Sequence, residues 1–105
     1  MLETKRDRLA RLYAEYEPLP FPPGFTRREP DGHCMAMMDS MLSGCISTAM
    51  AGPLDDWRRQ VLQVRTPLLG EILPLIGDDA YATKYFTYLY EMAVLAIELD
   101  NARRE

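Results

Sequence analysis

Five prolines between residues 18 and 30 constrain the fold of this chain more than any other feature. Proline lacks a backbone N–H and clashes with the preceding helical turn, so no helix can continue through this stretch. Residues 17–30 are therefore predicted to form an extended strap. Its apolar side chains, Leu19, Phe21 and Phe25, are expected to anchor it on the chain's own helices. A PxxP pattern from Pro20 to Pro23 leaves a second interpretation open, a ligand for an aromatic groove on a partner domain.

Helical periodicity surrounds the strap. Apolar residues recur at spacings of three and four, and the pattern predicts four helices. The predicted ranges are about 2–16, about 32–51, about 55–76 and about 79–103. Asp31 is the expected N-cap of the second helix, which should stop at Gly52. The third should be kinked or broken at Pro67.

The third and fourth helices carry the longest apolar stripes. Asp55 or Asp56 is the expected cap of the third helix, and Asp78 that of the fourth. One side of the third is expected to carry Trp57, Val61, Val64, Leu68 and Ile72. The main packing seam of the fourth should consist of Tyr81, Tyr85, Tyr88, Met92, Leu95 and Leu99, with Phe86, Leu89, Ala93 and Ala96 beside it. Its solvent edge should consist of Lys84, Thr87, Glu91 and Glu98.

These elements predict the fold class. No segment shows the alternation typical of a strand, and 105 residues are enough for a core without disulfides. The chain is expected to be all-α, a four-helix bundle-like single domain over residues 1–105, with the proline-rich strap between the first two helices.

Charge and hydropathy exclude several classes of partner. The net charge is −4 and the basic pairs are scattered, so nucleic-acid binding is not expected. Residues 1–17 contain no apolar signal region, and no apolar run is long enough to span a membrane. A cytoplasmic location follows, with both cysteines expected as reduced thiols and no membrane partner.

A sulfur-rich stripe raises the question of a metal. Cys34, Met38, Met41 and Cys45 follow at spacings of four, three and four, which puts them on one side of a helix. Thiolate and thioether groups are the ligands that Cu(I) prefers. Methionine and reduced cysteine are also ordinary core residues, and this interpretation is the preferred one. No cofactor is therefore expected.

Catalytic patterns are missing from the sequence. The single histidine, His33, excludes a three-histidine zinc site, and no phosphate-binding or nucleophile motif occurs. Paired aspartates at 55–56 and 78–79 are expected to cap helices. An enzyme is therefore not the favoured class. The aromatic residues Trp57, Tyr81, Tyr85, Tyr88 and Tyr90 form the predicted partner or ligand surface.

The remaining hypothesis is an interaction protein. The second helix carries a small row, Ala36, Ser40, Ser43 and Ser47, and like the fourth it is apolar around most of its circumference. Three neighbouring helices should not cover all of that surface, so a homodimer is predicted. The leading function is a non-enzymatic helical protein that self-associates and binds a partner protein. The alternatives are a Cu(I)-binding or redox helper protein and a bundle that binds a small ligand.

Overall fold

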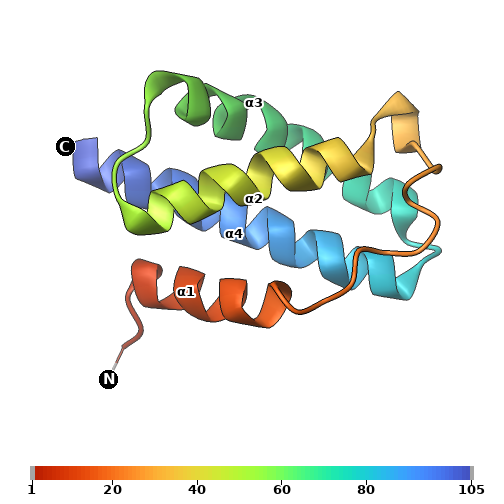
Figure 1. The fold of residues 1–105 in the computed structure, drawn as a ribbon, viewed down its shortest axis with the longest axis horizontal. Coiled ribbons are helices and arrows are strands. Elements are labelled where there is room, and N and C mark those ends of the chain that lie inside the picture. Colours follow the sequence, from red (N-terminus) through yellow and green to blue (C-terminus); the bar gives the residue numbers. More distant parts are fainter. Residues whose placement is uncertain (1, 105) are drawn as a thin grey trace.

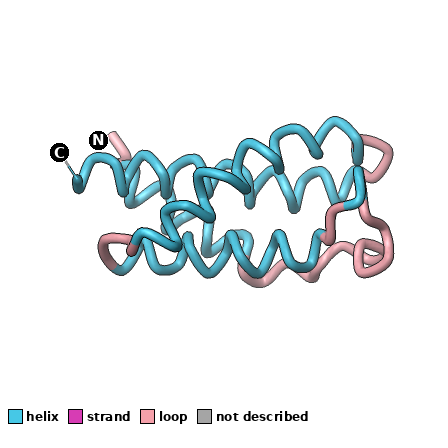
Figure 2. The backbone as a smooth tube through the Cα atoms, turned by 90° about the horizontal axis from the view of Figure 1, so that it is seen from above, coloured by secondary structure: helices cyan, strands magenta, loops and turns pink. Residues whose placement is uncertain are grey.

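The computed structural model describes residues 2–104 and is all-helical over that range. Its four α-helices run alternately in opposite directions, each antiparallel to the one before it in the chain (Figure 1). The elements in chain order are α1 (Lys5–Tyr16), η1 (Pro30–Gly32), α2 (Met35–Ala51), α3 (Asp56–Ile72), η2 (Leu73–Ile76) and α4 (Ala80–Arg104). Viewed from above, the helices run lengthwise and the connections lie mainly toward the two ends (Figure 2). The predicted four-helix bundle is confirmed.

The central helix is α4. It packs against α1, α2 and α3, so its apolar circumference is covered within one chain. The second predicted row is fully buried; it consists of Phe86, Leu89, Ala93 and Ala96. Of the predicted solvent edge, Lys84, Glu91 and Glu98 are exposed and Thr87 is half-buried. The expectation that α4 has surplus apolar surface was wrong, because three helices surround it.

Three of the long helices begin at a residue with a side-chain cap. The Thr4 hydroxyl and the Asp55 carboxylate accept the N–H groups of Asp7 and Arg58, and cap α1 and α3. In α4 the predicted cap, Asp78, was wrong by one residue. Asp79 accepts the N–H of Ala82 at 3.0 Å. Asp78 instead binds Arg28 of the strap.

The start of α2 also differs from the prediction. Asp31 is not its N-cap: it lies in the left-handed region at φ 52°, inside the short turn η1, and Gly32 follows at φ +79°. Two left-handed residues in succession cannot open a right-handed helix, so α2 begins after Cys34.

Pro67 lies inside α3 without breaking it. The helix is continuous from Asp56 to Ile72 and tightens into the 3-10 turn η2, which contains Pro74. Proline removes one helical hydrogen bond, the one that the carbonyl of Gln63 would accept, and both Gln63 and Pro67 are exposed residues. The alternative of a helix broken at Pro67 was wrong.

The strap is part of the core. Phe25 is 2% exposed, and Leu19 and Phe21 are partly buried against the core. Arg28 donates to the Asp78 carboxylate and to the carbonyl of Leu75, which ties the strap to the connection between α3 and α4. The predicted anchoring of the strap is confirmed.

Candidate interaction surface

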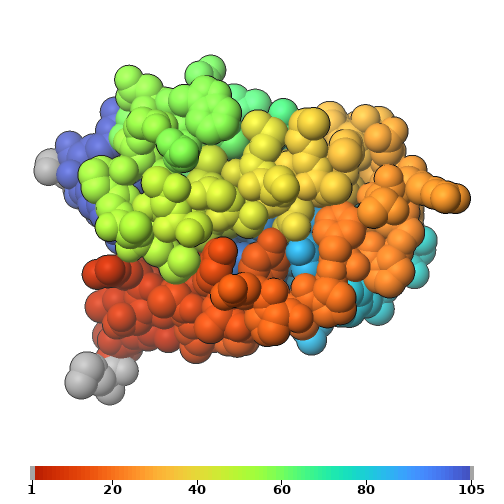
Figure 3. Space-filling model, viewed as in Figure 1, coloured from red at the N-terminus to blue at the C-terminus, as the bar shows by residue number. Residues whose placement is uncertain are grey.

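The outward side of α2 is uncharged. The only charged residue of the whole helix is Asp39, which is half-buried. The exposed residues of α2 are Ala36, Met37, Ser40, Gly44, Ser47 and Ala51. Surfaces of small domains usually carry about 25–35% charged residues. A second surface can therefore approach α2 without stripping water from a charge. Figure 3 views the molecule from the side on which α2 lies in front.

Five of these exposed residues follow the spacing of a helix-packing seam. They are Met37, Ser40, Gly44, Ser47 and Ala51, at intervals of three, four, three and four. This interval pattern keeps side chains along one line of the helix, where they meet a neighbouring helix. We call these five residues the α2 seam. Within the chain, the seam faces solvent.

Helix α3 adds exposed apolar side chains next to the seam. Trp57 is 62% exposed and Val64 is 60% exposed. The predicted stripe placed both with residues of the core, and for these two that grouping was wrong. Val61 and Ile72 of the predicted stripe are buried, together with Leu62 and Leu69 of the neighbouring stripe. These two stripes lie about one residue apart in helical phase, so periodicity alone could not separate them.

A hollow separates the α2 seam from Trp57. It has a volume of about 470 Å³ and is lined by Ser40, Met41, Gly44, Cys45, Thr48, Trp57 and Arg58. A second hollow of about 160 Å³ shares Met41 and Trp57 and extends along α3 to Val64 and Arg65. Both open to solvent, unlike pockets that enclose a small ligand. We refer to the α2 seam, the two hollows, Trp57 and Val64 together as the α2–α3 face.

Two polar clamps hold the end of α2 and the connection that leads into the first turn of α3, where Trp57 lies. The buried Asp100 of α4 accepts the Nε–H of Arg59 at 2.7 Å and the N–H of Leu54 at 3.1 Å. Arg59 also donates to the carbonyl of Leu54 at 2.6 Å. Arg103 donates to the carbonyls of Ala49 and Gly52 at the end of α2. The end of α4 therefore positions the start of α3.

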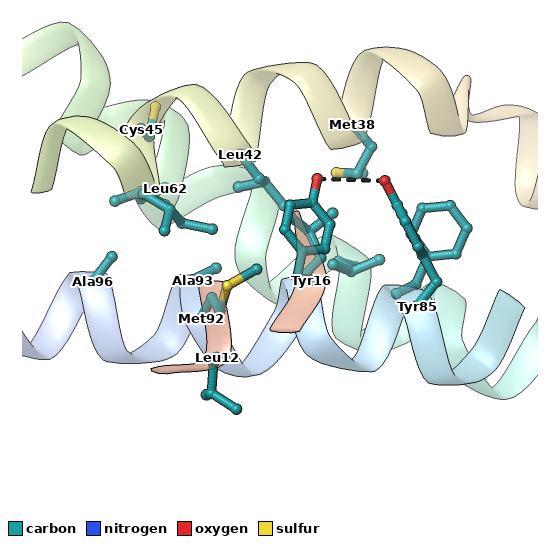
Figure 4. Close-up of a cluster of buried hydrophobic side chains, with 14 of the residues drawn as sticks. Leu12, Tyr16, Met38, Leu42, Cys45, Leu62, Tyr85, Met92, Ala93 and Ala96 are labelled. Atoms are coloured by element: carbon teal, nitrogen blue, oxygen red, sulfur yellow. Dashed lines mark hydrogen bonds between the residues drawn. The ribbon is translucent and has the colours of Figure 1, made fainter. Parts of the chain in front are cut away.

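A second polar cluster joins α1, α2 and α4. Asp39 accepts the hydroxyl of Tyr16 at 2.5 Å and that of Tyr85 at 2.9 Å. In Figure 4 the two tyrosine hydroxyls face each other beneath α2. Burial raises the pKa of Tyr85 to about 12 and that of Tyr16 further, so both remain donors at neutral pH. Burial also raises the pKa of Asp39, against the opposing effect of the two hydroxyls.

The Asp39 cluster gives a prediction with a defined sign. A carboxyl whose pKa is higher in the folded than in the unfolded chain stabilises the protein at low pH, and the contribution disappears as the pH rises above the unfolded value of 3.8. We expect Asp39→Asn to gain stability relative to the wild type between pH 4 and about 7, by about 1.4 kcal/mol for each unit of pKa difference. Urea denaturation across this range measures it.

Tyr16→Phe is the matched control for this measurement. It removes one donor to the ionised carboxylate, so the pKa of Asp39 should rise further and the loss of stability with rising pH should steepen. Equal pH profiles for the wild type and Asp39→Asn would contradict the assigned direction.

The structure divides the predicted aromatic surface. Trp57 lies on the exposed side of α3, whereas the tyrosines of α4 attach other elements to that helix. The hydroxyl of Tyr81 donates to the carbonyl of Pro20, and that of Tyr88 donates to Glu15. Tyr85 is buried in the Asp39 cluster, and the half-buried Tyr90 packs over Gly70. The tyrosines therefore act as packing contacts, and Trp57 alone contributes to the α2–α3 face.

The structure also places the four residues of the sulfur stripe in different surroundings. Cys34 is exposed before the first turn of α2, and Met38 is fully buried. Met41 and Cys45 line the larger hollow. Eleven residues of helical rise separate the two cysteines by about 16 Å. Burial raises the pKa of the Cys45 thiol, which disfavours the thiolate that binds metals. Within residues 2–104, no three His, Cys, Asp or Glu side chains gather closely enough to hold a metal ion. The Cu(I) site stays a prediction.

Sequence reasoning missed the two aspartates that organise the polar contacts. Each had a signal: Asp39 is the one charge in a 17-residue helix, and Asp100 continues the buried row of Ala93 and Ala96 by one further turn. No pattern revealed the hollows, which depend on how α2 and α3 pack.

In residues 2–104 no helix is both long and apolar enough to cross a membrane. Comparisons with protein-family models, curated proteins and solved structures found no match for this chain.

Proposed function

We propose that this protein is a non-enzymatic helical interaction module that associates with itself through the α2–α3 face. The observation that carries the proposal is an exposed tryptophan, Trp57, beside a helix side that is free of charge. Tryptophan is enriched among residues that dominate binding energy at protein interfaces, and charged residues are depleted at interface centres. A partner protein suited to this face would offer a helix with a similarly small, uncharged side.

The size of the face supports a reversible rather than an obligate association. Each of the two 17-residue helices is about 25 Å long and about 10–12 Å wide, and their axes lie about 8–10 Å apart. The pair is therefore about 20 Å wide, and its footprint is about 500 Å² per copy. Two copies would bury about 1,000 Å², the lower limit for a specific interface. We therefore expect a dimer that dissociates on dilution.

The two free thiols support placing the protein in the reducing cytoplasm.

Sedimentation velocity over a dilution series tests this function. We expect the wild type to shift between dimer and monomer, and Trp57→Lys to raise the dissociation constant about 30-fold, since a dominant interface tryptophan contributes about 2 kcal/mol. Leu75→Lys is the matched control: Leu75 is 51% exposed but lies beyond the end of α3 and lines neither hollow. A wild type that stays monomeric at high concentration, or equal effects of both variants, would rule out this role for the face.

A further inference from the structure

We infer that the α2–α3 face closes on a second copy of this chain as an antiparallel two-fold dimer, with α2 crossing its copy at Gly44 and the two Trp57 side chains meeting over the hollows. This inference rests on the proposed function and assigns it a geometry. It follows from Gly44, from the order of side chains along the α2 seam, and from the position of Trp57.

Gly44 has no explanation within a single chain. It lies in the interior of α2, and a Cβ added there would meet nothing within 4 Å. Its backbone conformation is one that any residue adopts, because its φ lies outside the positive range that favours glycine. Glycine in a helix interior is less stable than alanine. A residue without a side chain does have a use where another backbone approaches closely, and Gly44 is at the centre of the exposed seam.

The two ends of the α2 seam match in size when the helix is reversed about Gly44. Gly44 stands seven residues from Met37 and seven from Ala51. In an antiparallel crossing at Gly44, the large Met37 of one copy lies opposite the small Ala51 of the other. Ser40 lies opposite Thr48, a half-buried residue beside the seam. A large side chain therefore meets a small one at each end of the contact, and small side chains meet between them. The antiparallel arrangement also places the helix dipoles favourably, whereas a parallel one would place Met37 against Met37.

Trp57 completes the contact. It borders the larger hollow together with Gly44, so the two lie at similar positions along the face. The two-fold axis lies in the plane of the contact and crosses α2 at right angles at Gly44. This axis brings the Trp57 side chains of the two copies together. Each then covers the hollow of the other copy, which has about 470 Å³ of open space. The hollow thus stays open to solvent until the second copy contributes its tryptophan.

Site-directed disulfide formation tests this geometry. In a Cys34→Ser background, so that the exposed native thiol is absent, Gly44→Cys should form a covalent dimer when treated with oxidised glutathione, because the two positions meet at the axis. The substitution enters open space in a helix, so the fold should persist. Ser40→Cys in the same background should remain uncrosslinked, because residue 40 of the two copies would stand about 12 Å apart along the helix.

The double variant Ser40→Cys with Thr48→Cys should crosslink again, since these positions oppose each other across the axis. Crosslinking of Ser40→Cys alone would indicate a parallel dimer and overturn the inference. Failure of Gly44→Cys to crosslink while the protein still dimerises on sedimentation would also overturn it, and would leave the proposed function intact. A wild type that never dimerises would overturn both.

Discussion

Replacing Asp100 with alanine is expected to lower the free energy of unfolding by about 2–4 kcal/mol at pH 7. The Asp100 side chain is 2% exposed and its partner Arg59 is 16% exposed. Removing one member of a buried ion pair leaves the other charge without compensation, and the partial exposure of Arg59 moderates the cost. The variant also leaves the N–H of Leu54 without its acceptor. Urea denaturation followed by circular dichroism measures the change.

Asp56→Ala is the control for this experiment. Asp56 binds the same guanidinium at 2.8 Å, but its side chain is fully exposed. An ion pair in water contributes little, so this variant should have the same free energy of unfolding as the wild type. If the two aspartates had equal effects, burial would not be the cause.

The pH dependence of the Asp100 effect provides a second check. Burial alone would raise the pKa of Asp100, but the hydrogen bonds from Arg59 and Leu54 hold it below the usual 3.8. A carboxyl with a lowered pKa stabilises the folded chain above its unfolded pKa and loses that contribution as the pH falls. The difference between wild type and Asp100→Ala should therefore be complete at pH 7 and shrink in acid. This is the opposite sign to that expected for Asp39.

Helix periodicity accounts for most of what could be predicted. Four helices and the strap follow from local spacing and from proline chemistry, both of which are properties of neighbouring residues. Boundaries were less accurate because caps depend on competing contacts. Asp78 and Asp79 are equivalent as capping residues in the sequence; in the structure Asp78 binds the distant Arg28 of the strap and Asp79 caps α4.

The interaction surface was harder to predict because it depends on helix rotation. The stripe of Val61, Val64 and Leu68 and the stripe of Leu62 and Leu69 both satisfy helical spacing. Contact with α4 selects the second stripe, which leaves Trp57 and Val64 in solvent. The small row expected on α2 shares only Ser40 and Ser47 with the α2 seam. Its exposure was not visible in the sequence, since a small uncharged row suits a buried crossing equally well.

Replacing Phe25 with alanine is expected to lower the free energy of unfolding by about 3–5 kcal/mol, the usual range for a buried phenylalanine. Its ring is 2% exposed, and its centre lies 5.7 Å from that of the fully buried Phe86. The guanidinium of Arg28 stacks 5.2 Å from the same ring. Truncation would leave a cavity under the strap and remove this stacking contact. Thermal and urea unfolding should both show the loss, whereas Pro23→Ala, at an exposed strap position, should change stability little.

This comparison also decides between the two interpretations of the strap. A proline-rich ligand for a partner domain has to present its PxxP residues as free extended chain. Here the carbonyl of Pro20 accepts the hydroxyl of Tyr81, and Pro22 between the outer prolines is buried. A large loss in Phe25→Ala means that releasing the strap for a partner would cost much of the stability of the domain, since domains of this size are stabilised by only about 5–15 kcal/mol. A small loss would show that the strap can leave the bundle without unfolding it, and the ligand interpretation would then be the better one.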